Sequence, residues 1–335
     1  AAKAGQEGIL RSLPELSVPV MAQDASGQTP LHLAAYAGHE AIVRALIEMG
    51  MDVDVRTSAL QTPAHFAAAG GHAAILVVLN KSGAQLDARD DDGQTPAYAA
   101  ACEGGDGVVA LECLLGLGAA MDVADDAGQT IAHVAAQAGR ETSIRFLQTH
   151  GVGLAARDKD GRTPLHLAAQ GGSVSLVQCL LEADNSPMEK DKNARSPAHF
   201  AAIGGHVEVL NLLASLSADL NGQDNRGRGP AHCAAWAKRE NVLQYLGQQG
   251  VSLGVADHAG KTPAHYAAAE GHATILMCLY SHDAPIAEQN ADGETPLQLA
   301  TERGHLAVVA FFKEIGHADS YGAGHKRCVA PCLVQ

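Results

Sequence analysis

Seventeen histidines are the residues of this sequence best suited to chemistry. Imidazole binds zinc and acts as a general acid or base near neutral pH. Two sets recur at fixed spacing: the first is His32, His65, His133, His166, His199, His232 and His265, and the second is His39, His72, His206, His272 and His305. Metal and catalytic sites need unlike residues that converge, whereas these histidines recur one at a time. We therefore expect a structural role for them, with no bound metal and no catalytic histidine.

Other catalytic motifs are missing from the sequence. It has no nucleophile elbow, P-loop, dinucleotide fingerprint or metalloprotease motif, and its glycines recur at positions where turns need them. Five cysteines fall where a helix accepts a small apolar side chain: Cys102, Cys113, Cys179, Cys233 and Cys278. The sequence therefore predicts a protein that is not an enzyme and uses no cofactor.

Composition and charge restrict the class of protein further. Hydrophobic residues make up 47% of the chain and aromatic residues 4%, which suits thin layers packed with Ala, Leu and Val. The formal charge of −14 opposes binding to phosphate backbones, so we expect no nucleic-acid partner. The seven cysteines are irregularly spaced, and no apolar h-region or bilayer-spanning run is present. These features predict a reducing compartment, cytoplasmic or nuclear.

A repeat of 33 residues positions the histidines. The phrase Gly-x-Thr-Pro-x-His recurs along the chain, and its third position falls at Thr29, Thr62, Thr95, Thr130, Thr163, Ser196, Gly229, Thr262 and Thr295, with one step of 35. A fixed period of this length over most of a chain is typical of a solenoid, in which each unit stacks on its neighbours.

Each unit is predicted to be a turn, a short helix, a second turn and a longer helix. Residues 158–161 (Asp-Lys-Asp-Gly) favour a tight turn, because Asp bonds its own backbone and Gly accepts positive φ. Thr163 is a helix N-cap type and Pro164 suits the first helical position. Gly171 and Gly172 end that helix, and apolar residues spaced by three and four predict another over 174–181.

With its Thr-Pro-Leu-His-Leu-Ala-Ala segments at 29–35 and 163–169, the sequence resembles the ankyrin-repeat family. The resemblance implies an all-α, curved solenoid with a concave binding face, in which the first histidine set ties adjacent turns together. We expect a partial N-terminal capping repeat at 1–23, a C-terminal tail at 317–335, and nine repeats between them at 24–56, 57–89, 90–124, 125–157, 158–190, 191–223, 224–256, 257–289 and 290–316.

Departures from the family pattern mark places where we expect local irregularity. Residues 104–107 (Gly-Gly-Asp-Gly) hold two extra residues, and Ile131 replaces Pro. Leu60 replaces the Gly of the first turn, and Lys238 replaces the Gly between the helices. Gly229 replaces Thr in the same repeat as Lys238.

The resemblance implies that partners bind in the cup formed by the turns, or fingers, and the first helices. Most residues of that face are small or polar, but Tyr36, Ile203 and Trp236 are large. Ile203 and Trp236 come from consecutive repeats, which should stack about 10 Å apart. Buried aromatic anchors often dominate binding energies. The alternative for Trp236 is that it covers the unusual turn of its own repeat.

Charges divide the fingers into two groups. Basic residues are concentrated in repeats five to eight: Arg157, Lys159, Arg162, Lys190, Lys192, Arg195, Arg226, Arg228 and Lys261. Repeats three and four instead carry Asp90, Asp91, Asp92, Asp125 and Asp126. We expect an acidic peptide or protein surface to bind repeats five to eight, with Arg162, Lys192, Arg195, Arg226 and Arg228 among the contacts. The alternative is that these are the ordinary charges of exposed turns.

The last residues suggest a second kind of site. Residues 332–335 (Cys-Leu-Val-Gln) are similar to a farnesylation box, with Cys328 as a second acylation site. A metal site formed by His317, His325, Cys328 and Cys332 would have no established ligand spacing.

The function expected from the sequence is a non-enzymatic scaffold or adaptor that binds protein partners, including as a subunit of a large assembly. The alternative is a lipid-anchored adaptor, with membrane contact only if Cys332 or Cys328 is lipidated. Nothing in the sequence indicates a homo-oligomer. The expected location is the cytoplasm, cytoskeletal and ciliary assemblies included.

Overall fold

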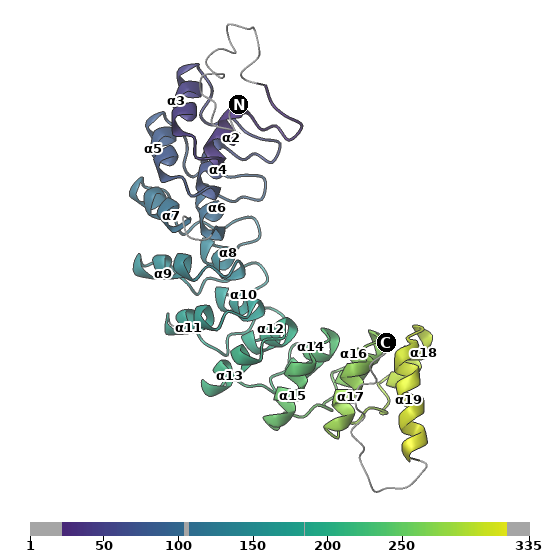
Figure 1. Cartoon of the computed structure of the whole chain (residues 1–335). Coiled ribbons are helices and arrows are strands. Elements are labelled where there is room, and N and C mark those ends of the chain that lie inside the picture. The colour runs from purple at the N-terminus through teal and green to yellow at the C-terminus, as the bar shows by residue number, and fades with distance from the viewer. Residues whose placement is uncertain (1–21, 104–106, 184, 320–335) are drawn as a thin grey trace. The chain divides into compact units, whose positions relative to one another are not determined.

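A computed structural model describes residues 22–103, 107–183 and 185–319, and within these ranges every regular element is a helix (Figure 1). The chain divides into two compact units, residues 1–224 and 225–335. The prediction of an all-α repeat architecture is therefore confirmed for the described residues. The capping repeat expected at 1–23 lies almost wholly outside the described residues, and so does most of the tail.

Helices alternate along the first unit between a short inner helix and a longer outer helix. The inner helices are α2 (Pro30–Tyr36), α4 (Pro63–Ala69), α6 (Pro96–Cys102), α8 (Ile131–Gln137), α10 (Pro164–Gly171) and α12 (Pro197–Gly204). The outer helices are α3 (Glu40–Glu48), α5 (Ala73–Lys81), α7 (Gly107–Gly116), α9 (Glu141–Thr149), α11 (Val174–Glu182) and α13 (Val207–Ser215). Each inner helix packs on the next inner helix, and each outer helix on the next outer helix.

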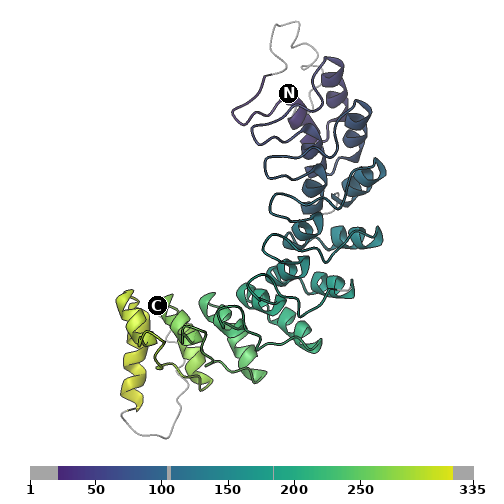
Figure 2. The same ribbon diagram turned by 180° about the vertical axis from the view of Figure 1, so that it is seen from behind.

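The second unit repeats this arrangement. Its inner helices are α14 (Pro230–Trp236), α16 (Pro263–Ala269) and α18 (Pro296–Glu302), and its outer helices are α15 (Glu240–Gln248), α17 (Ala273–Ser281) and α19 (Leu306–Asp319). In the first unit the finger turns, which are the loops that precede the inner helices, extend away from the outer helices (Figure 2).

Local sequence and stacking together determine the inner helices. Thr163 has the extended backbone of an N-cap (φ −103°, ψ 165°), and Pro164 begins α10. A helix this short is unstable by itself in water, so it depends on its neighbours. Ala168 and Ala169 are almost fully buried against them. In α8, Ile131 takes the place of Pro at the first position and is buried, so the helix still begins there.

The outer helices contribute several rows of core side chains, and one of these rows varies in size along the unit. In the first unit this row is Ile42, Ile75, Ala110, Ser143, Leu176 and Val209, and all six residues are buried. Ala110 and Ser143 are neighbours in this row and are much smaller than the others. Within this row, the side chains are therefore smallest at α7 and α9.

Two of the expected irregular turns instead keep the regular backbone. Leu60 and Lys238 both have φ of 58°, the left-handed conformation that glycine has at the corresponding positions. Sequence interpretation did not single out Ala194, which has φ of 60° in the same turn position as Leu60. The prediction of irregularity is therefore wrong at Leu60 and Lys238, where the side chains accept a strained conformation. The bulge expected at 104–107 lies mostly outside the described residues.

Candidate partner-binding surfaces

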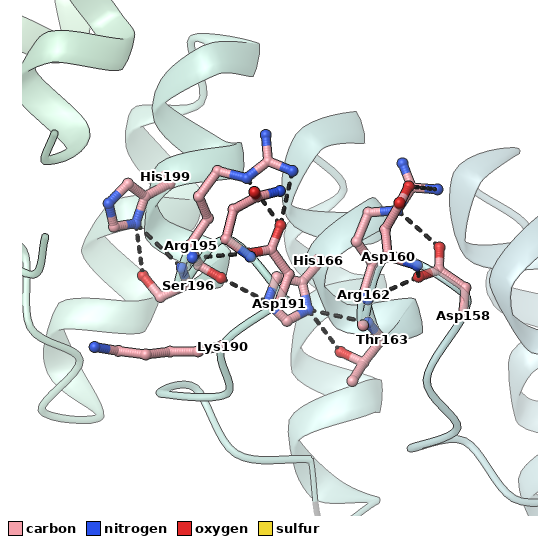
Figure 3. A network of polar contacts seen from close by, with 12 residues as sticks. Asp158, Asp160, Arg162, Thr163, His166, Lys190, Asp191, Arg195, Ser196 and His199 are labelled. Atoms are coloured by element: carbon pink, nitrogen blue, oxygen red, sulfur yellow. Dashed lines mark hydrogen bonds and ion pairs between the residues drawn. The ribbon is translucent and has the colours of Figure 1, made fainter. Parts of the chain in front are cut away.

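A buried aspartate organises most of the finger turns. The Oδ1 atom of Asp158 accepts hydrogen bonds from the backbone N–H groups of Asp160 (2.9 Å) and Arg162 (2.8 Å), as Figure 3 shows in part. The same two bonds recur at Asp90 and Asp125, which are only 9% and 7% exposed. Asp90 and Asp125 therefore add less exposed negative charge to these fingers than the sequence suggests, because their carboxylates hold their own turns.

Neighbouring fingers are joined through the backbone. The N–H of Lys159 donates to the carbonyl of Ala127, and the N–H of Lys192 donates to the carbonyl of Asp160, each at 2.9 Å. In the second unit the N–H of His258 donates to Arg226 in the same way. These hydrogen bonds connect the backbones of successive fingers. They limit the conformational freedom of the fingers before a partner binds.

The first histidine row joins most inner helices to the following finger. The Nδ1 atom of His166 accepts hydrogen bonds from the backbone N–H (3.1 Å) and the hydroxyl (2.9 Å) of Thr163 (Figure 3). A ring nitrogen that accepts a backbone N–H carries no proton, so the proton lies on Nε2. That group donates to the carbonyl of Arg195 at 3.1 Å. Burial lowers the pKa of His166 to about 4, which keeps the ring neutral.

Most of the row repeats this geometry. In five other members Nε2 lies 3.0 to 3.1 Å from a carbonyl of the following finger, in the pairs His32–Gln61, His65–Gln94, His133–Arg162, His232–Lys261 and His265–Glu294. Burial lowers the pKa values of His32, His65, His133 and His265. The predicted hydrogen bonding of this row to neighbouring turns is confirmed. Gly229 has no hydroxyl, so only its N–H donates to His232.

Histidines of the second row link four repeats to the repeat before them, a role that the sequence did not reveal. Nε2 lies close to a carbonyl at the end of the preceding inner helix in four pairs: His72–Tyr36 (2.9 Å), His206–Gln170 (3.0 Å), His272–Trp236 (3.2 Å) and His305–Ala269 (2.9 Å). Arg140 replaces histidine at this position and donates to the carbonyl of Cys102 at 2.7 Å. The feature of the sequence that could have indicated this role is the glycine of the preceding repeat. A Cβ on Gly38 would lie 2.7 Å from the His72 ring, so the position of the ring requires glycine there.

Two of the arginines predicted to contact a partner form ion pairs with aspartates of their own fingers. The Nε group of Arg162 donates to Asp158 at 2.7 Å, and Arg195 forms an ion pair with Asp191 at 2.7 Å (Figure 3). The Arg195 guanidinium also lies 4.8 Å from the centre of the Phe200 ring. Both arginines are partly buried. Lys192 is exposed on its finger, and in the second unit Arg226 is exposed and Arg228 partly buried.

The predicted large side chains of the binding face differ in exposure. Tyr36 is 52% exposed at the end of α2, and its ring lies edge-on to Phe66 at 6.5 Å. Trp236 is 50% exposed at the end of α14, whereas Ile203 in α12 is partly buried. Ile203 belongs to the first unit and Trp236 to the second, so their expected pairing stays a prediction.

The described residues form neither a metal-binding cluster nor a membrane-spanning helix. Among the described residues no cluster of His, Cys, Asp or Glu could hold a metal ion. No helix within the described ranges has the length and apolar character needed to cross a bilayer. The five cysteines among the described residues form no disulfide, and burial raises the pKa values of Cys179 and Cys278, the latter to about 11. Cys328 and Cys332 lie outside the described residues, so lipidation stays a prediction.

Comparison with protein families agrees with this geometry. A model of three ankyrin repeats matches residues 99–191, 168–257 and 248–319, and a second ankyrin-repeat model matches residues 1–47 and 32–80. A search of curated proteins finds no match. Since the three-repeat model alone matches more than half of the chain, this protein belongs to the ankyrin-repeat family.

Proposed function

We propose that this protein is a non-enzymatic scaffold or adaptor that binds a protein partner through the exposed ends of its inner helices and through its finger turns. Ankyrin repeats generally mediate protein–protein interactions. The observation that carries the proposal is Trp236, a tryptophan that is half exposed at the end of an inner helix. Interfaces are enriched in tryptophan and in arginine, and such anchors often contribute much of the binding energy.

Support for a recognition surface also comes from how the backbone is held. The carbonyl of Trp236 lies 3.2 Å from Nε2 of His272, so the next repeat fixes the backbone beneath the exposed indole. A side chain on a rigid backbone loses less conformational freedom when a partner covers it. We expect Arg226 and Arg228, on the finger of the same unit, to attract an acidic partner and to act mainly on association rate and salt dependence.

The test begins with the native protein, whose co-purifying partner is identified and then titrated against purified variants. Trp236→Ala should lower the affinity at least about thirtyfold, because truncating a buried tryptophan anchor typically costs about 2 kcal/mol or more. Arg228→Ala should weaken binding chiefly at low salt. Tyr280→Ala, an exposed aromatic on outer helix α17, is the control and should bind normally. If folded Trp236→Ala binds as tightly as the parent protein, the anchor lies elsewhere.

The alternative function is a lipid-anchored adaptor, which the sequence at 332–335 favours. Mass spectrometry of the native C-terminal peptide tests it. A farnesyl mass on Cys332 supports the anchor, and an unmodified thiol in the native protein contradicts it.

A further inference from the structure

Lys238 occupies a turn position that glycine fills elsewhere in both units. Its φ of 58° lies in the left-handed region, which L side chains rarely adopt. The corresponding residues with positive φ are Gly38, Gly71, Gly139, Gly172, Gly205, Gly271 and Gly304. Lysine at this position strains the backbone, because it must adopt the left-handed conformation that glycine adopts without a Cβ penalty.

The space beside this position is also occupied. A Cβ on Gly172 would lie 2.3 Å from the His206 ring, and one on Gly271 would lie 2.7 Å from the His305 ring. His272 is the corresponding ring for Lys238. Its hydrogen bond to the Trp236 carbonyl, at 3.2 Å, is the longest of the four in the second histidine row. Stability alone would therefore select glycine at 238, and strain retained at an exposed turn points to a functional side chain.

Charge and exposure indicate what this side chain could contact. Lys238 is exposed, and no ion pair involving it is found among the described residues. One repeat farther along, Glu270 already faces Arg303 at 3.7 Å. Trp236, two residues before Lys238, offers an apolar ring with half its surface exposed. The end of α14 and the turn after it thus carry an exposed indole and an exposed lysine two residues apart.

We propose that Trp236 and Lys238 together form a recognition site for a peptide segment that carries a carboxylate side chain next to a large aliphatic one. The carboxylate pairs with the Lys238 ammonium, and the aliphatic side chain covers the Trp236 indole. This proposal rests on the proposed scaffold function and specifies the chemistry of its partner. A lysine beside an indole would also suit a nucleic-acid strand, but the net charge of −14 opposes that ligand.

The only tryptophan of the chain reports directly on this site. Random peptides of about twelve residues are selected for binding to the full chain, and tryptophan-free winners are synthesised. Peptides that bind here should carry an acid beside Leu, Ile or Met, and should shift Trp236 emission to shorter wavelength. Lys238→Gln should weaken them about tenfold, and replacing the peptide's acid by Lys should do the same. Lys313→Gln, a charge-matched change at an exposed lysine of α19, should leave binding unchanged.

Lys238→Gly separates recognition from a purely structural role. We expect its melting temperature to rise by about 2 °C or more while affinity for the selected peptides falls about tenfold. Stabilisation with unchanged affinity overturns the proposal. If selected peptides bind without changing Trp236 emission, the scaffold function survives and this site is rejected. If neither these peptides nor any natural partner binds, both proposals fail. A single-stranded oligonucleotide that binds more tightly than the acidic peptides, and loses its effect on Trp236 emission in Lys238→Gln, also overturns the peptide assignment.

Discussion

The hydroxyl of Thr95 is buried without a hydrogen-bond partner because the residue three positions later is Tyr98 rather than histidine. At the same position in another repeat, the Thr163 hydroxyl lies 2.9 Å from Nδ1 of His166. Tyr98 has no acceptor at that point of its ring. Its own hydroxyl instead donates to the carbonyls of Val123 (2.8 Å) and Gln129 in the next finger. Tyrosine thus keeps the link between fingers and loses the link to the N-cap.

Replacing Thr95 by valine should therefore stabilise the protein, because the variant no longer buries an unpaired hydroxyl. We expect the free energy of unfolding to rise by about 1 kcal/mol, measured by urea denaturation. Thr163→Val is the matched control, and it should lower that free energy by about 1 kcal/mol because it removes a satisfied hydrogen bond. Equal effects of the two substitutions would mean that the Thr95 hydroxyl is not unpaired in solution.

Ser143 is a second buried hydroxyl without a partner, in the core row that is otherwise aliphatic. Ser143→Ala should raise the free energy of unfolding by about 1 kcal/mol or more, since it removes the desolvated hydroxyl and favours the helix. Thr142→Ala, an exposed change in the same helix, measures the helix-propensity gain alone and should stabilise less. A gain at Ser143 no larger than that at Thr142 would contradict the assignment.

Leu60 is 43% exposed and has positive φ in a turn where Gly93 occupies the corresponding position one repeat later. Leu60→Gly should raise the free energy of unfolding by about 1 kcal/mol, because glycine adopts this conformation without the Cβ penalty. The reverse change, Gly93→Leu, should destabilise, since a Cβ there would lie 2.5 Å from Asp126 Oδ1. Thermal unfolding of both variants is the measurement, and a loss of stability in Leu60→Gly would show that its side chain has a packing role.

The sequence predicted the helices well because each repeat carries its own signals, such as Thr163 and Pro164 at the start of α10. Periodicity also predicted that His166 would link neighbouring turns. Periodicity could not show which charged side chains are exposed. Asp90 and Asp91 are adjacent aspartates in the sequence, but only the Asp90 carboxylate lies inside its turn.

The partner-binding residues were harder to predict for a related reason. Arg195 looked like a free basic contact, but its pairing with Asp191 and its position over Phe200 depend on side-chain directions that spacing does not encode. Lys238 was noticed only as a departure from the glycine pattern. Its strained φ and the crowding expected beside His272 became clear only once the neighbouring repeat was in place.

The neutral state of the first histidine row should make stability depend on pH. Burial lowers the pKa of His166 from its ordinary value of 6.5 to about 4, so the unfolded chain binds a proton more readily than the folded one. The stability that this residue contributes is fully present above about pH 6.5, and it is lost as the pH falls through about 4. Between pH 7.5 and pH 5.0, a single site with these pKa values should cost about 2 kcal/mol of unfolding free energy.

The substitution His166→Gln isolates the contribution of this histidine to the pH dependence of stability. In the last repeat Gln298 occupies the histidine position, and its Oε1 accepts the Thr295 N–H at 2.7 Å, so His166→Gln should keep the N-cap bond. The variant should be less stable at pH 7.5, because no group replaces Nε2–H on the Arg195 carbonyl. It should nevertheless lose about 2 kcal/mol less than the parent protein on acidification to pH 5.0, measured by urea denaturation at both pH values. If His166→Gln retains the full pH dependence, another group carries the acid sensitivity and the neutral assignment of His166 is wrong.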